Sequence, residues 1–194
     1  MSIFNLYFEI GLKHITDLVG YDHILFLVTL CAVYSILQWR QLLILITAFT
    51  IGHSITLALA IMNIILIPSK IIEFLIPLTI LITSVTNIFQ KGTTVSAKIH
   101  KLKYITAMFF GLIHGLGFSN FLRGVLSSEE NLFKPLLAFN LGLEAGQLAI
   151  ITCFVILLVI FNKILKVNER EWNLFFSGAG FGISTVLMFE RYPF

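Results

Sequence analysis

Hydrophobic residues in this chain occur in long runs that are separated by short charged segments. A helix needs about 20 apolar residues to cross the hydrocarbon core of a bilayer, and six runs of that order are present. They are Ile24–Trp39, Gln41–Pro68, Phe74–Gln90, Tyr104–Leu122, Pro135–Asn162 and Trp172–Phe189. The pattern predicts an all-α fold, a polytopic membrane helical bundle of about six transmembrane helices.

A shorter, partly apolar segment precedes the first run. Residues 1–20 contain Glu9 and Lys13 but lack the basic start and small-residue cleavage site of a signal peptide, so we expect the segment to be retained. It is expected to lie at the membrane interface or to extend the first span, with a break at Gly20. Residues 1–194 are thus predicted to form a single integral membrane domain.

The composition supports a membrane protein and argues against a nucleic-acid partner. Hydrophobic residues make up 58% of the chain and charged residues 12%, and the mean hydropathy is +0.96, which exceeds what a soluble domain needs for its core. The net charge of +3 is spread over the loops rather than gathered in a basic patch. Membrane lipid is therefore the expected surrounding partner.

The orientation follows from the positions of Lys and Arg, because cytoplasmic loops are enriched in them. One side of the predicted bundle carries eight: Arg40, Lys91, Lys98, Lys101, Lys103, Lys163, Lys166 and Arg170. The other side carries five: Lys13, Lys70, Arg123, Lys134 and Arg191. This imbalance predicts that both termini lie outside.

Four ionisable side chains lie within or just inside the apolar runs, where such a group costs several kcal/mol unless it faces a partner or a wet cavity. They are His23, His53, His114 and Glu144. Under the predicted topology, His53, His114 and Glu144 lie about ten residues or slightly more from the outer ends of their helices, a similar depth at about 1.5 Å per residue. A shared polar site in the outer half of the membrane is expected, with His23 at its mouth.

The first candidate group combines His14, Asp22 and His23. On one unbroken helix the two histidines, nine residues apart, would point in opposite directions. A bend near Gly20 would bring them together beside Asp22, which gives two imidazoles and a carboxylate, a set that suits zinc or nickel. The alternative is that Asp22 caps the first membrane helix and His14 is a solvated interfacial residue.

The second group surrounds His53. Thr50, His53 and Ser54 share one helix face through their i, i+3 and i+4 spacing, and this polar stripe must face protein. It could bind a metal, or it could only bridge neighbouring helices through hydrogen bonds.

The third group surrounds His114. Gly111 and Gly115 form a GxxxG pair, which permits close helix approach. Packing explains the glycines but not the imidazole, which needs a partner or a ligand from the adjoining helix.

The fourth group contains Glu144, the one charged residue in the middle of any run. Asn140, Glu144 and Gln147 fall within a face about 60° wide. A protonated, hydrogen-bonded Glu is the structural alternative, but three histidines at comparable depth favour metal coordination or proton exchange. Glu73, at the start of the third run, is a weaker supporting candidate.

Several of these motifs resemble those of the HupE/UreJ family of bacterial membrane proteins. The resemblance covers nearly the whole chain and is carried by His14-Ile, Gly20-Tyr-Asp22-His23-Ile-Leu-Phe-Leu, Thr47-Ala-Phe-Thr50-Ile-Gly-His53-Ser54-Ile-Thr56-Leu57, Phe110-Gly111-Leu-Ile-His114-Gly115-Leu-Gly117-Phe118, Phe139-Asn140, Glu144-Ala-Gly-Gln147 and Glu190-Arg191. It implies a nickel or cobalt permease of the bacterial inner membrane. Members of the family often carry a His-Pro start, where this chain has His14-Ile.

The leading hypothesis is therefore a permease for a divalent transition metal, nickel, cobalt or zinc. Its metal ligands would be His14, Asp22, His23, His53, His114 and Glu144, in a site open to the outside. Imidazoles and carboxylates bind these ions without the redox chemistry of thiolates. Because six short spans are few for a permease with two gates, a homo-oligomer is also expected.

The rival hypothesis is an intramembrane zinc-dependent hydrolase that acts on a lipid or a peptide. Three histidines and Asp22 would hold the metal, a bound water would attack the substrate, and Glu144 would act as the general base. A third alternative is that the polar residues only join helices.

Overall fold

The computed structural model describes residues 2–90, 95–126 and 131–193 and is mainly helical, without a strand in these ranges. This confirms the all-α fold. The elements are α1 (Ile3–Thr16), α2 (Asp22–Cys31), the 3-10 turn η1 (Ile36–Gln38), α3 (Trp39–Ile61), α4 (Ser69–Ile88), α5 (Ala97–Gly117), α6 (Ser119–Leu126), α7 (Phe133–Leu165) and α8 (Glu169–Glu190).

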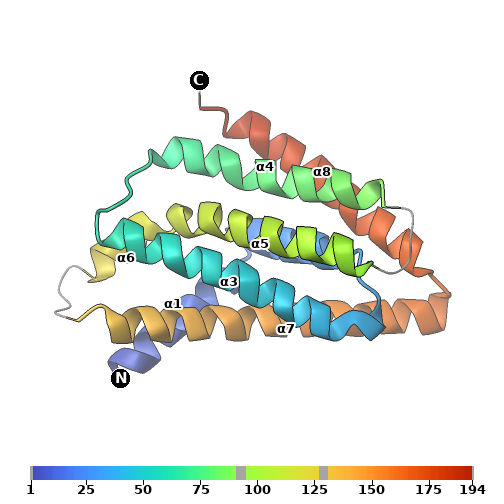
Figure 1. Ribbon diagram of the computed structural model, residues 1–194, viewed down its shortest axis with the longest axis horizontal. Coiled ribbons are helices and arrows are strands. Elements are labelled where there is room, and N and C mark those ends of the chain that lie inside the picture. Colours follow the sequence, from blue (N-terminus) through green and yellow to red (C-terminus); the bar gives the residue numbers. More distant parts are fainter. Residues whose placement is uncertain (1, 91–94, 127–130, 194) are drawn as a thin grey trace.

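The long helices run side by side along the longest axis of the molecule (Figure 1). One end of the bundle, which we call the cation-rich end, holds Arg40, Lys98, Lys101, Lys103, Lys163, Lys166 and Arg170. The opposite, cation-poor end holds Lys13, Lys70, Arg123, Lys134 and Arg191. The helices thus separate the two sets of cations as the sequence predicted, whereas Lys91 lies outside the described residues.

The number of long spanning helices differs from the prediction of about six. In the described part of the chain, four helical segments are long and apolar enough to cross a membrane: residues 36–61, α4, α7 and α8. Helices α5 and α6 meet at a bend of 53° and make a fifth if they count as one span. The predicted first span, Ile24–Trp39, is instead the 10-residue helix α2 followed by non-helical backbone.

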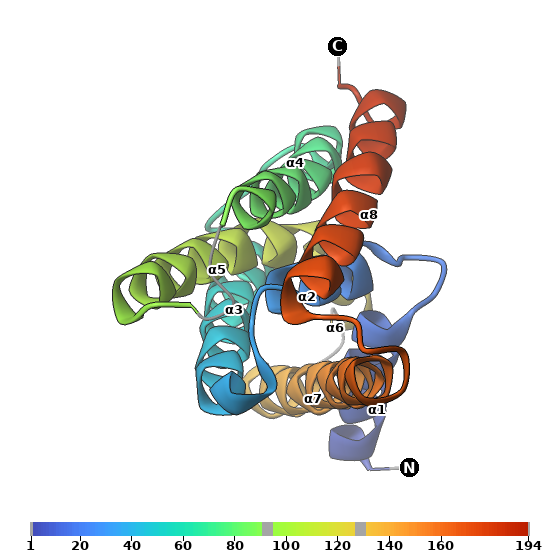
Figure 2. The same ribbon diagram turned by 90° about the vertical axis from the view of Figure 1, so that its right-hand side faces the viewer.

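The central position of α2 explains why a short helix suffices there. Seen along the bundle, α2 lies among α4, α7 and α8 (Figure 2), and Phe26 and Leu27 are fully buried. Residues 22–38 still extend from one end of the bundle to the other. At the cation-poor end, Arg191 donates to the carboxylate of Asp22. At the cation-rich end, the side chain of Gln38 exchanges hydrogen bonds with the backbone of Val95. Near the end of α2, the backbone carbonyl of Thr29 accepts a hydrogen bond from the side chain of Asn87 on α4, so a neighbouring helix supplies a polar partner where α2 stops short.

Helices α3 and α5 pack through glycines. A Cβ atom at Gly111 would overlap the carbonyl of Phe49, and one at Gly52 would overlap the carbonyl of Met108. Gly115 lies equally close to the carbonyl of His53. Both helices thus supply glycines to the contact: the predicted GxxxG pair on α5 and Gly52 on α3. This is expected for helices whose backbones approach closely.

Helices α1 and α7 pack in the same way, which the sequence interpretation did not foresee. A side chain at Gly11 would overlap the carbonyl of Phe139, and one at Gly142 would overlap the carbonyl of Phe8. The N-terminal segment is thus docked on α7, and Tyr7 of α1 is buried with its hydroxyl bonded to the carbonyl of Val125 on α6. The chain leaves α1 at Thr16 and begins α2 at Asp22, so the break expected near Gly20 is present.

Candidate metal centre

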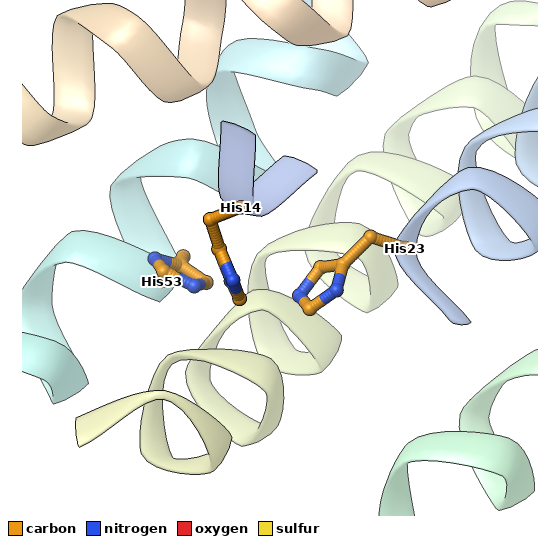
Figure 3. Close-up of side chains that lie close together, drawn as sticks. All are labelled: His14, His23 and His53. Atoms are coloured by element: carbon orange, nitrogen blue, oxygen red, sulfur yellow. The ribbon is translucent and has the colours of Figure 1, made fainter. Parts of the chain in front are cut away.

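Three histidines from three helices point toward a common space. His14 comes from α1, His23 from α2 and His53 from α3 (Figure 3). One ring nitrogen from each can be chosen so that all three atoms lie within 4.8 Å of one another. The ring centroids of His14 and His23 are 4.6 Å apart, because the break between α1 and α2 turns the chain back on itself. A single ion can therefore be shared by all three side chains after a small contraction.

His114 lies against these three histidines and is hydrogen-bonded to a threonine of another helix. Its ring centroid is 5.1 Å from that of His23, and its Nε2 is 3.1 Å from the hydroxyl of Thr79 on α4. That hydroxyl donates its one proton to the carbonyl of Ile76 at 2.7 Å, so it must accept a proton from Nε2 of His114. The hydrogen-bond network thus assigns the tautomer whose Nδ1 carries a free lone pair.

Five buried ring nitrogens of these histidines lack hydrogen-bond partners in the described part of the protein. This holds for Nε2 of His14 and His23, for both nitrogens of His53 and for Nδ1 of His114. An unsatisfied buried polar atom costs about 1–3 kcal/mol, and native structures pair nearly all such atoms. Several bare lone pairs within one cluster fit a bound cation better than they fit a helix contact.

The two acidic residues predicted as ligands lie outside the group of three histidines. Both carboxylate oxygens of Asp22 accept hydrogen bonds from Arg191, at 2.6 and 3.3 Å. Burial acts to lower the pKa of Arg191, but the hydrogen bond and charge of Asp22, helped by the charges of Glu73 and Tyr21, raise it. Asp22 thus joins α2 to the end of α8, and Glu73, which is exposed, lies near this pair.

Glu144 belongs to the contact between α7 and α3. Its carboxylate accepts a hydrogen bond of 3.2 Å from Thr47 and is half-buried. One turn further, Thr50 donates to the side chain of the fully buried Gln147 at 2.7 Å.

Two further polar residues were predicted to support the site. Ser54 donates to the carbonyl of Thr50 within its own helix. Asn140 likewise donates to the carbonyl of Leu136, while its buried Oδ1 finds no partner among the described residues. Ser54 and Asn140 thus bond within their own helices, whereas Thr50 and Gln147 join α3 to α7.

A family model described as HupE / UreJ protein matches residues 1–191. The chain belongs to the HupE/UreJ family. No curated protein and no solved structure gives a significant match to the chain.

In this HupE/UreJ protein, aromatic rings enclose the histidines. Phe26 and Phe49 pack near His114, with ring centroids 5.0 and 5.2 Å away. Phe118 covers His14 at 3.8 Å and stacks in turn on Phe139. An apolar shell of this kind limits the access of water to a polar site.

The same HupE/UreJ chain has a surface groove of about 670 Å³ beside His14. Lys13, Thr16, Phe118 and Phe121 also line it, so the groove lies where α1 ends and α6 begins. This is the cation-poor end of the bundle. His14 is half-buried, whereas His53 and His114 are completely buried, and the cluster is therefore reached from this end through His14.

Thr79 and the phenylalanines of the shell were missed by the sequence interpretation. Thr79 could have been noticed, because Thr79, Thr83 and Asn87 repeat at intervals of four residues within an apolar run. Phe118 and Phe139 lie within the motifs of the family resemblance, but no local pattern indicates that their rings pack against His14.

Proposed function

We propose that this protein is a permease for a divalent transition metal, nickel, cobalt or zinc, in the bacterial inner membrane. The HupE/UreJ family is associated with nickel and cobalt transport. The observation that carries the proposal is the convergence of His14, His23 and His53, whose buried nitrogens have no other partner in the described structure. Neutral imidazoles are good ligands for all three metals.

In the proposed site, His114 is the fourth nitrogen ligand. Its Nε2 is held by Thr79, and this arrangement resembles the outer-shell hydrogen bonds that orient metal-binding histidines. Asp22 and Glu144 would join the coordination only after leaving Arg191 and Thr47, their present partners. We therefore propose a site of histidines with carboxylates near it, in place of the mixed set expected from the sequence.

The proposed direction of entry is from outside. The positive-inside rule places the cation-rich end in the cytoplasm, so the groove beside His14 opens to the outer side. An incoming ion would meet His14 first and then the buried His23 and His53.

The zinc hydrolase remains the second candidate, because three histidines with an open position are also a catalytic zinc pattern. Its general base would have to lie close to the metal-bound water. Glu144, the predicted base, is bonded to Thr47 in the α3–α7 contact and is not among the clustered side chains. This position favours the permease.

Metal analysis of the purified protein tests the site. Wild-type protein should bind nickel, cobalt or zinc, and His53→Ala should lower the affinity by more than the roughly 10- to 100-fold that loss of an outer-shell partner costs. His100→Ala is the matched control, because His100 bonds to Tyr34 at the cation-rich end, away from the cluster.

Uptake into proteoliposomes tests the transport. His53→Ala and His114→Ala should abolish metal uptake, and His100→Ala should not. Equal binding and uptake by all four proteins would refute the proposal. Tight binding of one zinc without uptake, together with cleavage of lipid in the same vesicles, would support the hydrolase.

A further inference from the structure

A line of buried polar side chains leads from the histidine cluster toward the cation-rich end. Thr79, Thr83 and Asn87 share one face of α4 and are 2, 4 and 0% exposed. Thr79 is bonded to His114 at the start of this line. Because α4 runs from the cation-poor to the cation-rich end (Figure 1), the line continues from the proposed site to the opposite side of the bundle.

Asn87 closes the line by joining three other helices. Its amide donates to the carbonyl of Thr29 on α2 at 2.7 Å, and its side-chain oxygen accepts from Lys103 of α5 at 2.6 Å. Its backbone carbonyl accepts from Asn173 of α8 at 3.0 Å. The end of the polar line is thus plugged by the ammonium group of Lys103.

A cavity of about 700 Å³, open at the surface of the bundle, lies beside this plug, between α4 and α5. Thr83, Thr86, Lys103 and Thr106 contribute polar groups to a mostly apolar lining. The cavity gives the Lys103 side chain a space into which it can move when it leaves Asn87.

Lys103 and Arg170 occupy the same region but are held differently. Arg170 binds the carbonyls of Ile88 and Gln90 at the end of α4 and so caps that helix. Lys103 makes one hydrogen bond, to a side chain. Neither cation forms an ion pair within the described residues, so Lys103 is an uncompensated positive charge that can be displaced.

We infer that Lys103, held by Asn87, is the inner gate of the metal pathway. This inference rests on the proposed transport function and specifies where the metal ion leaves the pathway. A fixed positive charge in a partly buried position repels a divalent cation strongly, so an ion on the histidines is retained until Lys103 swings into the cavity. The metal pathway is then open beside His14 and closed at Lys103. A transporter that works by alternating access must adopt one state of this kind, open to one side only.

Cysteine labelling measures this gate without any metal. Thr83→Cys is introduced into a protein in which Cys31 and Cys153 are replaced by Ser. The protein is placed in two vesicle preparations, one with the cation-rich end facing the outer solution and one with the cation-poor end facing it. Each preparation is treated with a positively charged, membrane-impermeant thiol reagent. Lys103→Met should speed labelling from the cation-rich end on the order of tenfold, because the repelling charge is gone. Lys103→Gln, which keeps a hydrogen-bond donor toward Asn87 but no charge, should do the same.

Two variants serve as controls. Lys101→Met removes an exposed charge of the same helix, and Lys103→Arg keeps the charge at the gate. Both should label as slowly as the parent protein. Equal labelling rates in the parent, Lys103→Met and Lys103→Gln proteins would overturn the gate.

The same variants distinguish a failure of the gate from a failure of the function. Lys103→Met should bind nickel as wild type does but take it up several-fold faster, whereas His53→Ala should lose binding. If the labelling rate depends on Lys103 while no variant changes metal uptake, the gate at Lys103 is supported and the proposal that the transported ion is a divalent transition metal is refuted.

Discussion

Two glycine-packed helix pairs, α3–α5 and α1–α7, carry most of the candidate metal centre, and they differ in how firmly they hold it. In both pairs the backbone of one helix touches a glycine of the other. The α3–α5 pair buries His53 and His114 completely. In the α1–α7 pair, α1 has only 14 residues and leaves His14 half-buried beside the groove. One pair thus fixes the interior of the site, and the other forms its entrance.

A short sequence repeat accompanies this difference. Gly11-Leu-Lys-His14 in α1 matches Gly111-Leu-Ile-His114 in α5. Glycine and histidine at i and i+3 lie on the same helix face, so the glycine brings the partner backbone close and places the imidazole beside that contact. At the third position, Lys13 is exposed and pairs with Glu9, whereas Ile113 packs against the core. At this position, α1 thus has a charged, exposed side chain, whereas α5 has an apolar side chain that packs against the core.

The same kind of glycine contact is expected to differ in stability between the two pairs. Helix α5 is covered by α3, α4 and α6, while α1 packs mainly on α7, with fewer contacts to α2 and a hydrogen bond from Tyr7 to Val125 of α6. Short terminal elements with few neighbours open locally at lower free energy than central ones. We therefore expect α1 to undock without unfolding of the bundle.

The largest expected effect is on the interior pair. Gly111→Ala places a Cβ against the carbonyl of Phe49 and should lower the free energy of unfolding by about 3 kcal/mol, measured by denaturant titration in detergent. Gly178→Ala in α8 is the matched control, because nothing lies within 4 Å of that position. It should be neutral or stabilising by up to about 1 kcal/mol. Equal stabilities of the two variants would contradict the close α3–α5 contact.

A smaller global effect is expected at the entrance pair. Gly11→Ala overlaps the carbonyl of Phe139, but undocking of α1 limits the loss of stability to about 1 kcal/mol. Hydrogen exchange should rise within residues 3–16, and metal affinity should fall as it does in His14→Ala. Gly182→Ala, at an open position, should change neither measurement. Cooperative unfolding of the whole bundle in Gly11→Ala would remove the distinction between the pairs.

The smallest effect concerns how the interior pair orients its imidazole. Thr79→Val removes the acceptor of the His114 Nε2 proton and should weaken nickel binding about 10-fold, the lower limit for an outer-shell partner. Calorimetric titration can measure this change. Thr185→Val is a suitable control, since Thr185 is half-buried and its hydroxyl donates to the carbonyl of Phe181 in its own helix. The same affinity in both variants would exclude His114 from the site.

Much of this site followed from the sequence. Histidines in apolar runs had to face protein, and the break near Gly20 allowed His14 to meet His23, which the structure places 4.6 Å apart between ring centroids. The role of Asp22 did not follow. Its partner Arg191 is 169 residues away, and the local sequence around Asp22 is equally consistent with a helix cap or a metal ligand.

The amino-acid pattern alone specified the all-α class, the separation of cations to two ends and the helices that carry each histidine. These properties depend on what each segment can place in lipid, and composition records that directly. The contacts of the folded molecule alone settle that α2 is a short central helix, that three histidines meet while Asp22 and Glu144 bind elsewhere, and that Lys103 bonds to Asn87 at the cation-rich end. Those outcomes depend on contacts between segments distant in the chain, and no local pattern specifies such contacts.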